Sequence, residues 1–152
     1  MILRKILAIL VAFVFYPATQ ADASPISDLL EAKSIRCDFD KGAAASWDNG
    51  DVNVSSDNFG EGGRVFYTDI NHKSNTAKSS GNNGESDLVV IATPGGINFL
   101  EATGVGNMIF TSIFADYAEP EAKKYFAVTS RHVNVFGNPI PSQYHGTCII
   151  AG

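Results

Sequence analysis

The chain has 152 residues, of which 11 are Lys or Arg and 16 are Asp or Glu, so its formal net charge is −5. This acidic balance argues against nucleic acid as a partner, because phosphates require a basic surface, and against stable association with an anionic membrane. The length suits a single domain with its own core, and no internal repeat divides it.

The N-terminal segment has the three parts of a secretory signal peptide. Two basic residues are followed by an uncharged apolar stretch at residues 6–16 and then by an Ala-Asp-Ala cleavage site. The apolar stretch is too short to span a bilayer as an anchor. We therefore predict that residues 1–23 are a signal peptide, that residues 24–152 form one mature domain, and that the protein is exported to the periplasm or the extracellular space.

Two cysteines, Cys37 and Cys148, lie near the two ends of this expected domain. In an exported protein two cysteines most simply form one disulfide, and no Cys-x-x-Cys spacing indicates a redox site. We expect a bridge between them that closes a loop of about a hundred residues and stabilises the fold by roughly 4–5 kcal/mol.

The expected domain begins with a short helix and continues as strands. Ser24 can cap the helix, with Pro25 at its first position and Lys33 in its last turn. Alternating apolar and polar residues then predict a half-buried strand at residues 34–39. A turn at residues 40–42 is expected to end this strand.

Strand and turn signals alternate through the middle of the chain. Asn49-Gly50 is the strongest short hairpin signal. Residues 64–70 form a clear strand in which Tyr67 and Ile70 are expected on opposite faces. Residues 115–122 are expected to form an exposed loop. Further strands are predicted at residues 76–80, 87–92, 97–101 and 108–114.

The C-terminal arm contains the most strand-like run of the sequence, at residues 124–135. Residues 137–141, which include two prolines, are expected to turn the chain into a last strand at residues 144–150. The two strands should pair as consecutive antiparallel neighbours.

About ten short candidate strands joined by turns, with no helix between them, indicate an antiparallel all-β fold. The expected disulfide joins the first strand to the last, and these strands are neighbours only if the sheet closes. A closed sheet also leaves no exposed strand edge. We therefore predict a small up-and-down β-barrel of about 8–10 strands with a short N-terminal helix, and a β-sandwich is the alternative.

Five residues of the C-terminal arm form the candidate ligand site. Ser130, Arg131 and His132 follow one another on one predicted strand, and Gln143 and Tyr144 lie on the next. We predict that the five cluster at one end of the barrel, where their groups suit a carboxylate, a phosphate or a sugar. The alternative is that they satisfy one another and hold the final hairpin together.

Catalytic and metal chemistry have less support. Ser130 and His132 share a strand face, but no Gly-x-Ser-x-Gly motif accompanies them, so no catalytic residue is predicted. The histidines, which also include His72 and His145, lack the spacing of a ligand pair. We predict no metal site and no cofactor. Nothing in the sequence brings Glu101 together with a second carboxylate.

Several segments together resemble a group of small exported bacterial proteins of unassigned function. The resemblance spans most of the expected domain and implies a bacterial source and export, but no activity. The segments are Cys37-Asp-Phe-Asp-Lys-Gly with Trp47, Gly81-Asn-Asn-Gly, Ser130-Arg-His and Ser142-Gln-Tyr-His-Gly-Thr-Cys148.

The expected barrel is also similar in architecture to the lipocalins. In that arrangement a tryptophan near the chain start stacks on an arginine of a late strand, and Trp47 and Arg131 are the matching residues here. The lipocalin Gly-x-Trp signature is absent, because Ala45 stands where its glycine would be. The similarity therefore concerns architecture alone.

Two classes of function follow from these features. A closed barrel of about eight strands can hold one small molecule, and the aromatic residues of this chain can line such a cavity. The alternative is a periplasmic protein-binding module or hydrolase inhibitor, although the Ser-x-Ser-Gly-type loop of the lysozyme inhibitors is missing. The expected partner is thus a small molecule or an exported protein, and an enzyme ranks third.

Overall fold

The structure is a computed structural model that describes residues 24–60, 62–81, 84–104 and 106–152. The predicted signal peptide at residues 1–23 lies outside the described residues. Within the described part, no helix has the length and apolar content needed to cross a membrane. The elements are α1 (Pro25–Glu31), β1 (Ile35–Asp48), β2 (Asp51–Asn58), β3 (Arg64–Asn71), β4 (Thr76–Gly81), β5 (Gly84–Thr93), β6 (Gly96–Ala102), β7 (Met108–Glu119), the 3-10 turn η1 (Pro120–Ala122), β8 (Lys124–Val135) and β9 (Asn138–Ile150).

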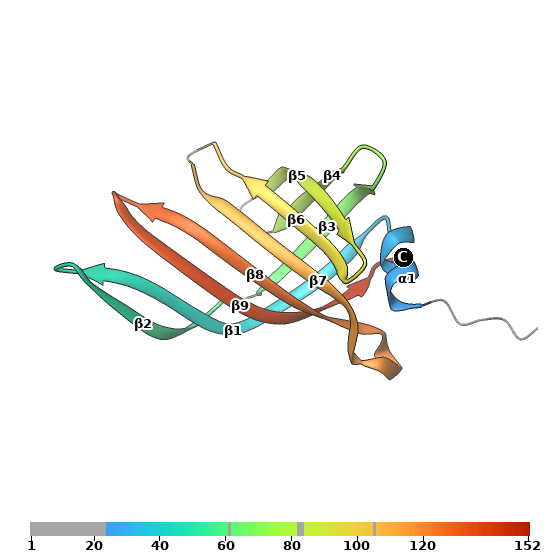
Figure 1. The fold of residues 1–152 in the computed structure, drawn as a ribbon, viewed down its shortest axis with the longest axis horizontal. Coiled ribbons are helices and arrows are strands. Elements are labelled where there is room, and N and C mark those ends of the chain that lie inside the picture. Colours follow the sequence, from blue (N-terminus) through green and yellow to red (C-terminus); the bar gives the residue numbers. More distant parts are fainter. Residues whose placement is uncertain (1–23, 61, 82–83, 105) are drawn as a thin grey trace, which may run out of the picture.

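Eight of these strands form a closed antiparallel barrel. From β3 to β9 each strand pairs with the next along the chain, and β1 pairs with both β3 and β9. β2 lies outside the ring, because it pairs only with the second half of β1 in a hairpin (Figure 1). The predicted up-and-down barrel with a short N-terminal helix is therefore confirmed, and the sandwich alternative is not what the chain forms.

The seam between β1 and β9 carries the predicted disulfide. Cys37 and Cys148 are register partners with their Cα atoms 4.0 Å apart, and both are fully buried. Two glycines allow the backbones to approach closely on this seam. A Cβ atom on Gly42 would overlap the carbonyl oxygen of Gln143, and one on Gly146 would overlap that of Asp38. The predicted bridge is confirmed, and it joins the first strand of the ring to the last.

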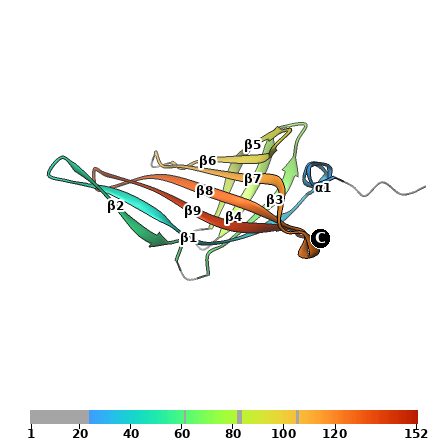
Figure 2. The ribbon, with the colours of Figure 1, turned by 60° about the horizontal axis from the view of Figure 1, so that its bottom comes forward.

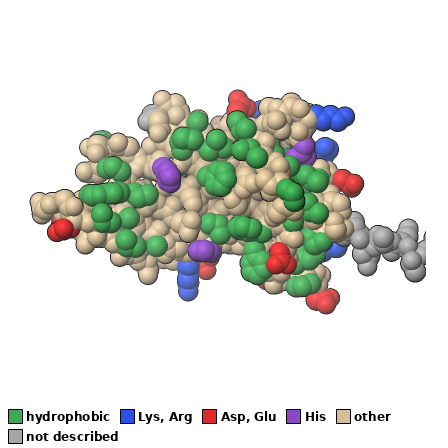
Figure 3. Space-filling view, in the orientation of Figure 1, with side chains coloured by type: hydrophobic (Ala, Val, Ile, Leu, Met, Phe, Trp, Pro, Cys, Tyr) green, Lys and Arg blue, Asp and Glu red, His purple; other side chains and the backbone are tan. Residues whose placement is uncertain are grey.

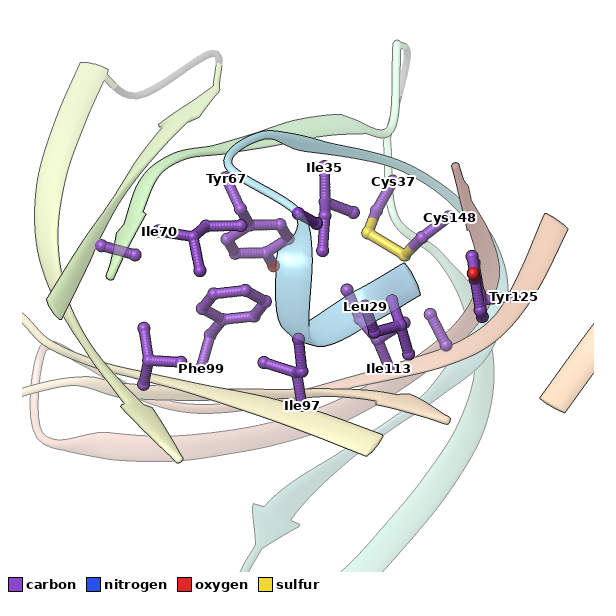
Figure 4. Close-up of a cluster of buried hydrophobic side chains, with 14 of the residues drawn as sticks. Leu29, Ile35, Cys37, Tyr67, Ile70, Ile97, Phe99, Ile113, Tyr125 and Cys148 are labelled. Carbon is purple, nitrogen blue, oxygen red and sulfur yellow. A yellow bond between two sulfur atoms is a disulfide. The ribbon is translucent and has the colours of Figure 1, made fainter. Parts of the chain in front are cut away.

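Helix α1 closes one end of the barrel. The Ser24 hydroxyl accepts a hydrogen bond from the Ser27 N–H, and Pro25 occupies the first turn. The helix ends at Glu31, so the expectation that Lys33 lies in its last turn was wrong. Leu29 points from α1 into the barrel and is fully buried there (Figure 4).

The core around Leu29 consists of inward-pointing side chains from several strands. Tyr67 stacks on Phe99 with ring centroids 4.2 Å apart, and Tyr125 lies fully buried beside the disulfide (Figure 4). Other buried members include Ile35, Ile97 and Ile113. The apolar core therefore fills the half of the barrel that α1 covers.

Two segments that were predicted as a turn and as a loop belong to continuous strands. Residues 40–42 do not turn the chain, since β1 runs through them with a register shift between Phe39 and Gly42, as in a β-bulge. Residues 115–122 are not a loop up to Glu119, because β7 continues and Tyr117 pairs with Tyr125. In both places hydrogen bonding to the neighbouring strand keeps the backbone extended, although the residues there are polar or small.

Two local assignments were also wrong. Asp69 has φ +52°, and the register between β3 and β4 shifts here, so Tyr67 and Ile70 both face the core. The final hairpin turn is tighter than expected, because Val135 already pairs with Asn138. The prolines predicted to turn the chain instead lie in β9 before its pairing with β1 begins, where it is an edge strand that tolerates proline.

We expect Leu29→Ala to lower the free energy of unfolding by about 2–5 kcal/mol, because it empties a fully buried site. Leu30→Ala is the matched control, since this neighbour in α1 is 40% exposed and should cost about 0.5 kcal/mol or less. Urea denaturation of both variants measures the difference. Equal costs would mean that α1 does not plug the barrel.

We expect the double substitution of Cys37 and Cys148 by alanine to lower the free energy of unfolding by about 4 kcal/mol, since the bridge spans 111 residues of sequence. Urea denaturation provides the measurement. Intact mass after alkylation of the native protein is the companion experiment, and two modified thiols there would rule out the bridge.

Candidate ligand site in the barrel mouth

The end of the barrel opposite α1 contains a cavity of about 330 Å³. It begins where the apolar core ends, at Glu101, two residues after Phe99 along β6, and at Thr129, two residues after Ala127 along β8. Much of its wall is polar. The polar lining side chains include Ser79, Ser80, Ser86, Glu101, Thr129 and Arg131.

Two opposite charges flank an apolar residue on one wall of this cavity. Glu101 of β6 and Arg131 of β8 are both register partners of Ile109 on β7, which lies between them. All three alternate with buried residues of their strands, such as Phe99 and Thr129, and therefore point into the barrel. The three side chains form one row across the mouth.

The Glu101 carboxylate is only partly satisfied by the protein. The Ser79 hydroxyl donates a hydrogen bond to its Oε2 at 3.3 Å. No ion pair within the described ranges includes Glu101. A carboxylate accepts about four hydrogen bonds, so Glu101 retains capacity for a donor in the cavity.

The Arg131 guanidinium is held by aromatic rings. It lies over the Phe59 ring, 5.5 Å from its centroid, and over the Tyr144 ring at 6.0 Å. Those rings meet edge to face, with centroids 5.1 Å apart. Such stacking orients the guanidinium and leaves its in-plane N–H donors free. Arg131 makes no ion pair with any residue that the structure describes.

A hydrogen bond between Tyr144 and Asp57 ties β2 to the barrel beside this stack. The Tyr144 hydroxyl donates to Asp57 Oδ2 at 2.6 Å. This bond, the Asn58 backbone N–H and the positive charge of Arg131 lower the pKa of Asp57. The contact anchors the end of β2, from which Phe59 enters the barrel.

A chain of hydroxyl groups forms the floor of the cavity. Tyr67 donates to Thr111 at 2.9 Å, and Thr111 donates to Thr129 at 2.9 Å. All three residues are buried, and burial raises the pKa of Tyr67. The floor is therefore polar but internally bonded, and it separates the mouth from the apolar core.

The five predicted site residues lie at one level of β8 and β9 but on two faces. Arg131 and Tyr144 face the interior, whereas Ser130, His132 and Gln143 face outward, and the Gln143 amide donates to the Ser130 hydroxyl at 3.1 Å. Neighbouring residues of a strand alternate between faces, so an adjacent arginine and histidine cannot share one. The pairing of the two strands is confirmed, and a ligand-binding role for the residues stays a prediction.

The expected stacking of Trp47 on Arg131 was wrong. Trp47 is 47% exposed on the β1–β2 hairpin, where it lines an outer cleft with His132. β1 carries this residue beyond the last register pair with β9, Ala44 with Ser142, and so away from the interior. Phe59 and Tyr144 take the place of the tryptophan at the guanidinium.

No cluster of three His, Cys, Asp or Glu side chains that could hold a metal ion occurs in the described residues. His132 and His145 are exposed on the outside of the barrel. His72 lies in a different part of the fold, where burial and the nearby Lys33 lower its pKa. The three histidines are thus not brought together.

Sequence reasoning missed most of the cavity wall. The alternation of Ile97, Phe99 and Glu101 already placed that glutamate on the core face, which is the signal that it lines the interior. Ser79 and Phe59 had no such signal, because a weak strand and a loop carry them.

Comparison with known proteins found no matching family model, no matching curated protein and no matching solved structure. The resemblance to small exported bacterial proteins therefore stays a prediction. The fold and the cavity define the class of protein as a small, disulfide-closed β-barrel with a charged and polar mouth.

We expect Tyr144→Phe to raise the pKa of Asp57 toward its ordinary value, because the substitution removes the hydrogen bond that contributes most to lowering it. Titration of the carboxyl groups by NMR measures the change. Tyr117→Phe is the matched control, because this hydroxyl lies beside Asp28 of α1 at the other end of the barrel, and it should leave the pKa of Asp57 unchanged. An unchanged Asp57 in Tyr144→Phe would show that the Tyr144 hydroxyl does not hold this carboxylate.

Proposed function

We propose that the protein is an exported binding protein that holds one small polar molecule in the mouth of its barrel. The observation that carries this proposal is the cavity of about 330 Å³ with Glu101 and Arg131 in its wall, neither in an ion pair within the described residues. Ligand sites in proteins begin at about this size and use a few convergent polar groups to orient the ligand.

The energetics support a ligand more than a purely structural role. Apolar side chains fill a barrel end without the cost of partly removing a charge from water, yet Glu101 and Arg131 are half-buried there and make no ion pair within the described residues. The hydroxyl groups of the floor already satisfy one another, so they do not need the two charges as partners. Glu101 and Arg131 thus remain available to a bound molecule.

Export is supported by two features that agree. The disulfide at the seam fits an oxidising compartment such as the periplasm or the extracellular space. The sequence of residues 1–23 has the parts of a signal peptide.

A protein-binding module or hydrolase inhibitor is the second candidate, and exposed apolar side chains favour it. The β1–β2 and β8–β9 hairpins extend beyond the barrel (Figure 2). Val54 on the first is 71% exposed, and Phe136 at the tip of the second is fully exposed. Hydrophobic side chains are spread over the face seen in Figure 3, including its elongated end.

We expect native mass spectrometry of the protein purified from its own host to show one retained small molecule, and Ser86→Trp to remove it. Ser86 is half-buried and lines the cavity, so an indole here fills the mouth. Asp87→Trp is the matched control, because this exposed neighbour faces outward.

The same spectra distinguish the two candidates. A retained protein partner that both variants keep would replace the proposal by the second candidate. A small molecule that Ser86→Trp retains as well as the control does would place binding outside the mouth.

A further inference from the structure

We propose that the molecule bound in the mouth is a small zwitterion, with its carboxylate on Arg131 and its ammonium group on Glu101. The inference rests on the proposed function and deepens it by naming the chemical class of the ligand. It is carried by the order of the row across β6, β7 and β8, which reads anion, apolar residue, cation.

The spacing of the row sets the size of the ligand. Glu101 and Arg131 are separated by one intervening strand, so their Cα atoms lie about 10 Å apart, twice the usual distance between neighbouring strands. Both side chains point into the same cavity. The cavity of about 330 Å³ that they share suits a compact molecule whose two charged groups are joined by a short aliphatic chain, and Ile109 supplies the apolar surface for that chain.

Arg131 is prepared for a carboxylate. The Phe59 and Tyr144 rings fix the orientation of the guanidinium without neutralising it. A guanidinium with free in-plane donors binds a carboxylate through two parallel hydrogen bonds. The charge of Arg131 acts on Asp57, but the two form no ion pair within the described residues, and both Asp57 oxygens accept other donors, the Asn58 N–H and the Tyr144 hydroxyl.

Glu101 decides between a zwitterion and a simple anion. A second carboxylate or a phosphate on the ligand would meet the like charge of Glu101, which disfavours binding. Among the described lining residues the second cation is Arg64, whose Nε already pairs with Asp38 at 2.8 Å, so it is in part neutralised and less suited to a dianion. An ammonium group, in contrast, offers Glu101 the donors that Ser79 alone does not supply.

The test titrates the disulfide-bonded protein with matched probes and measures binding by calorimetry. The zwitterions are glycine, 4-aminobutyrate and 6-aminohexanoate, which vary the distance between the charges. Butyrate and butylamine each keep one charge of 4-aminobutyrate, and acetate, methylamine, hexanoate and hexylamine do the same for the other two. We expect at least one zwitterion to bind ten-fold or more tightly than either of its singly charged analogues.

Two variants assign the charges. Arg131→Gln should remove the advantage of that zwitterion over its amine, and Glu101→Gln should remove its advantage over its carboxylate. Lys124→Gln is the control, because Lys124 lies on the same strand as Arg131 but pairs with Glu119 away from the cavity. It should leave all affinities unchanged.

The outcomes separate this inference from the proposed function. If no zwitterion binds more tightly than its singly charged analogues, the inference is overturned, and this comparison needs no variant to fold. The proposed function still stands in that case if the native protein retains a different small molecule that Ser86→Trp expels. A ten-fold preference that both charge variants keep would also overturn the assignment to Arg131 and Glu101.

Discussion

The pairing of β1 with β9 is the constraint on which the rest of the structure depends. It closes an up-and-down sheet into a barrel. Every second residue of each strand then points into an interior that is shielded from solvent. The disulfide and two seam glycines serve this one contact, the first by a covalent bond and the others by allowing close backbone approach. The seam also places Tyr144 of β9 opposite Gly42 of β1, close to the β2 segment that it anchors.

Closure gives the barrel two unlike ends. The inward residues of β8 change from Tyr125 and Ala127 in the core to Thr129 on the cavity floor and Arg131 in the mouth. One end is filled because α1 inserts Leu29. At the other end the structure describes no second helix, and the polar row of that end lines a cavity.

Alternation in single strands was enough to predict most of the strands and the bounds of β8, and the expected disulfide then decided for a closed barrel. Alternation failed to predict the structure where pairing with a neighbouring strand determines the local backbone. The bulge after Phe39 and the extension of β7 to Glu119 depend on ladders with distant strands, and the left-handed Asp69 reverses the alternation of β3. The row of Glu101 and Arg131 depends on the register of three strands, which no stretch of the sequence contains by itself.

The charged groups at the mouth are of two kinds, those that are paired within the protein and those that are not. Only the second kind is available to a ligand. Asp57 and Arg64 have protein partners, and these contacts hold the two ends of the segment between β2 and β3 against the barrel. Glu101 and Arg131 share one wall yet are kept apart by Ile109 and by the rings that hold the guanidinium. In the proposed complex, the separation of Glu101 and Arg131 leaves room for a ligand that presents its ammonium group to Glu101 and its carboxylate to Arg131.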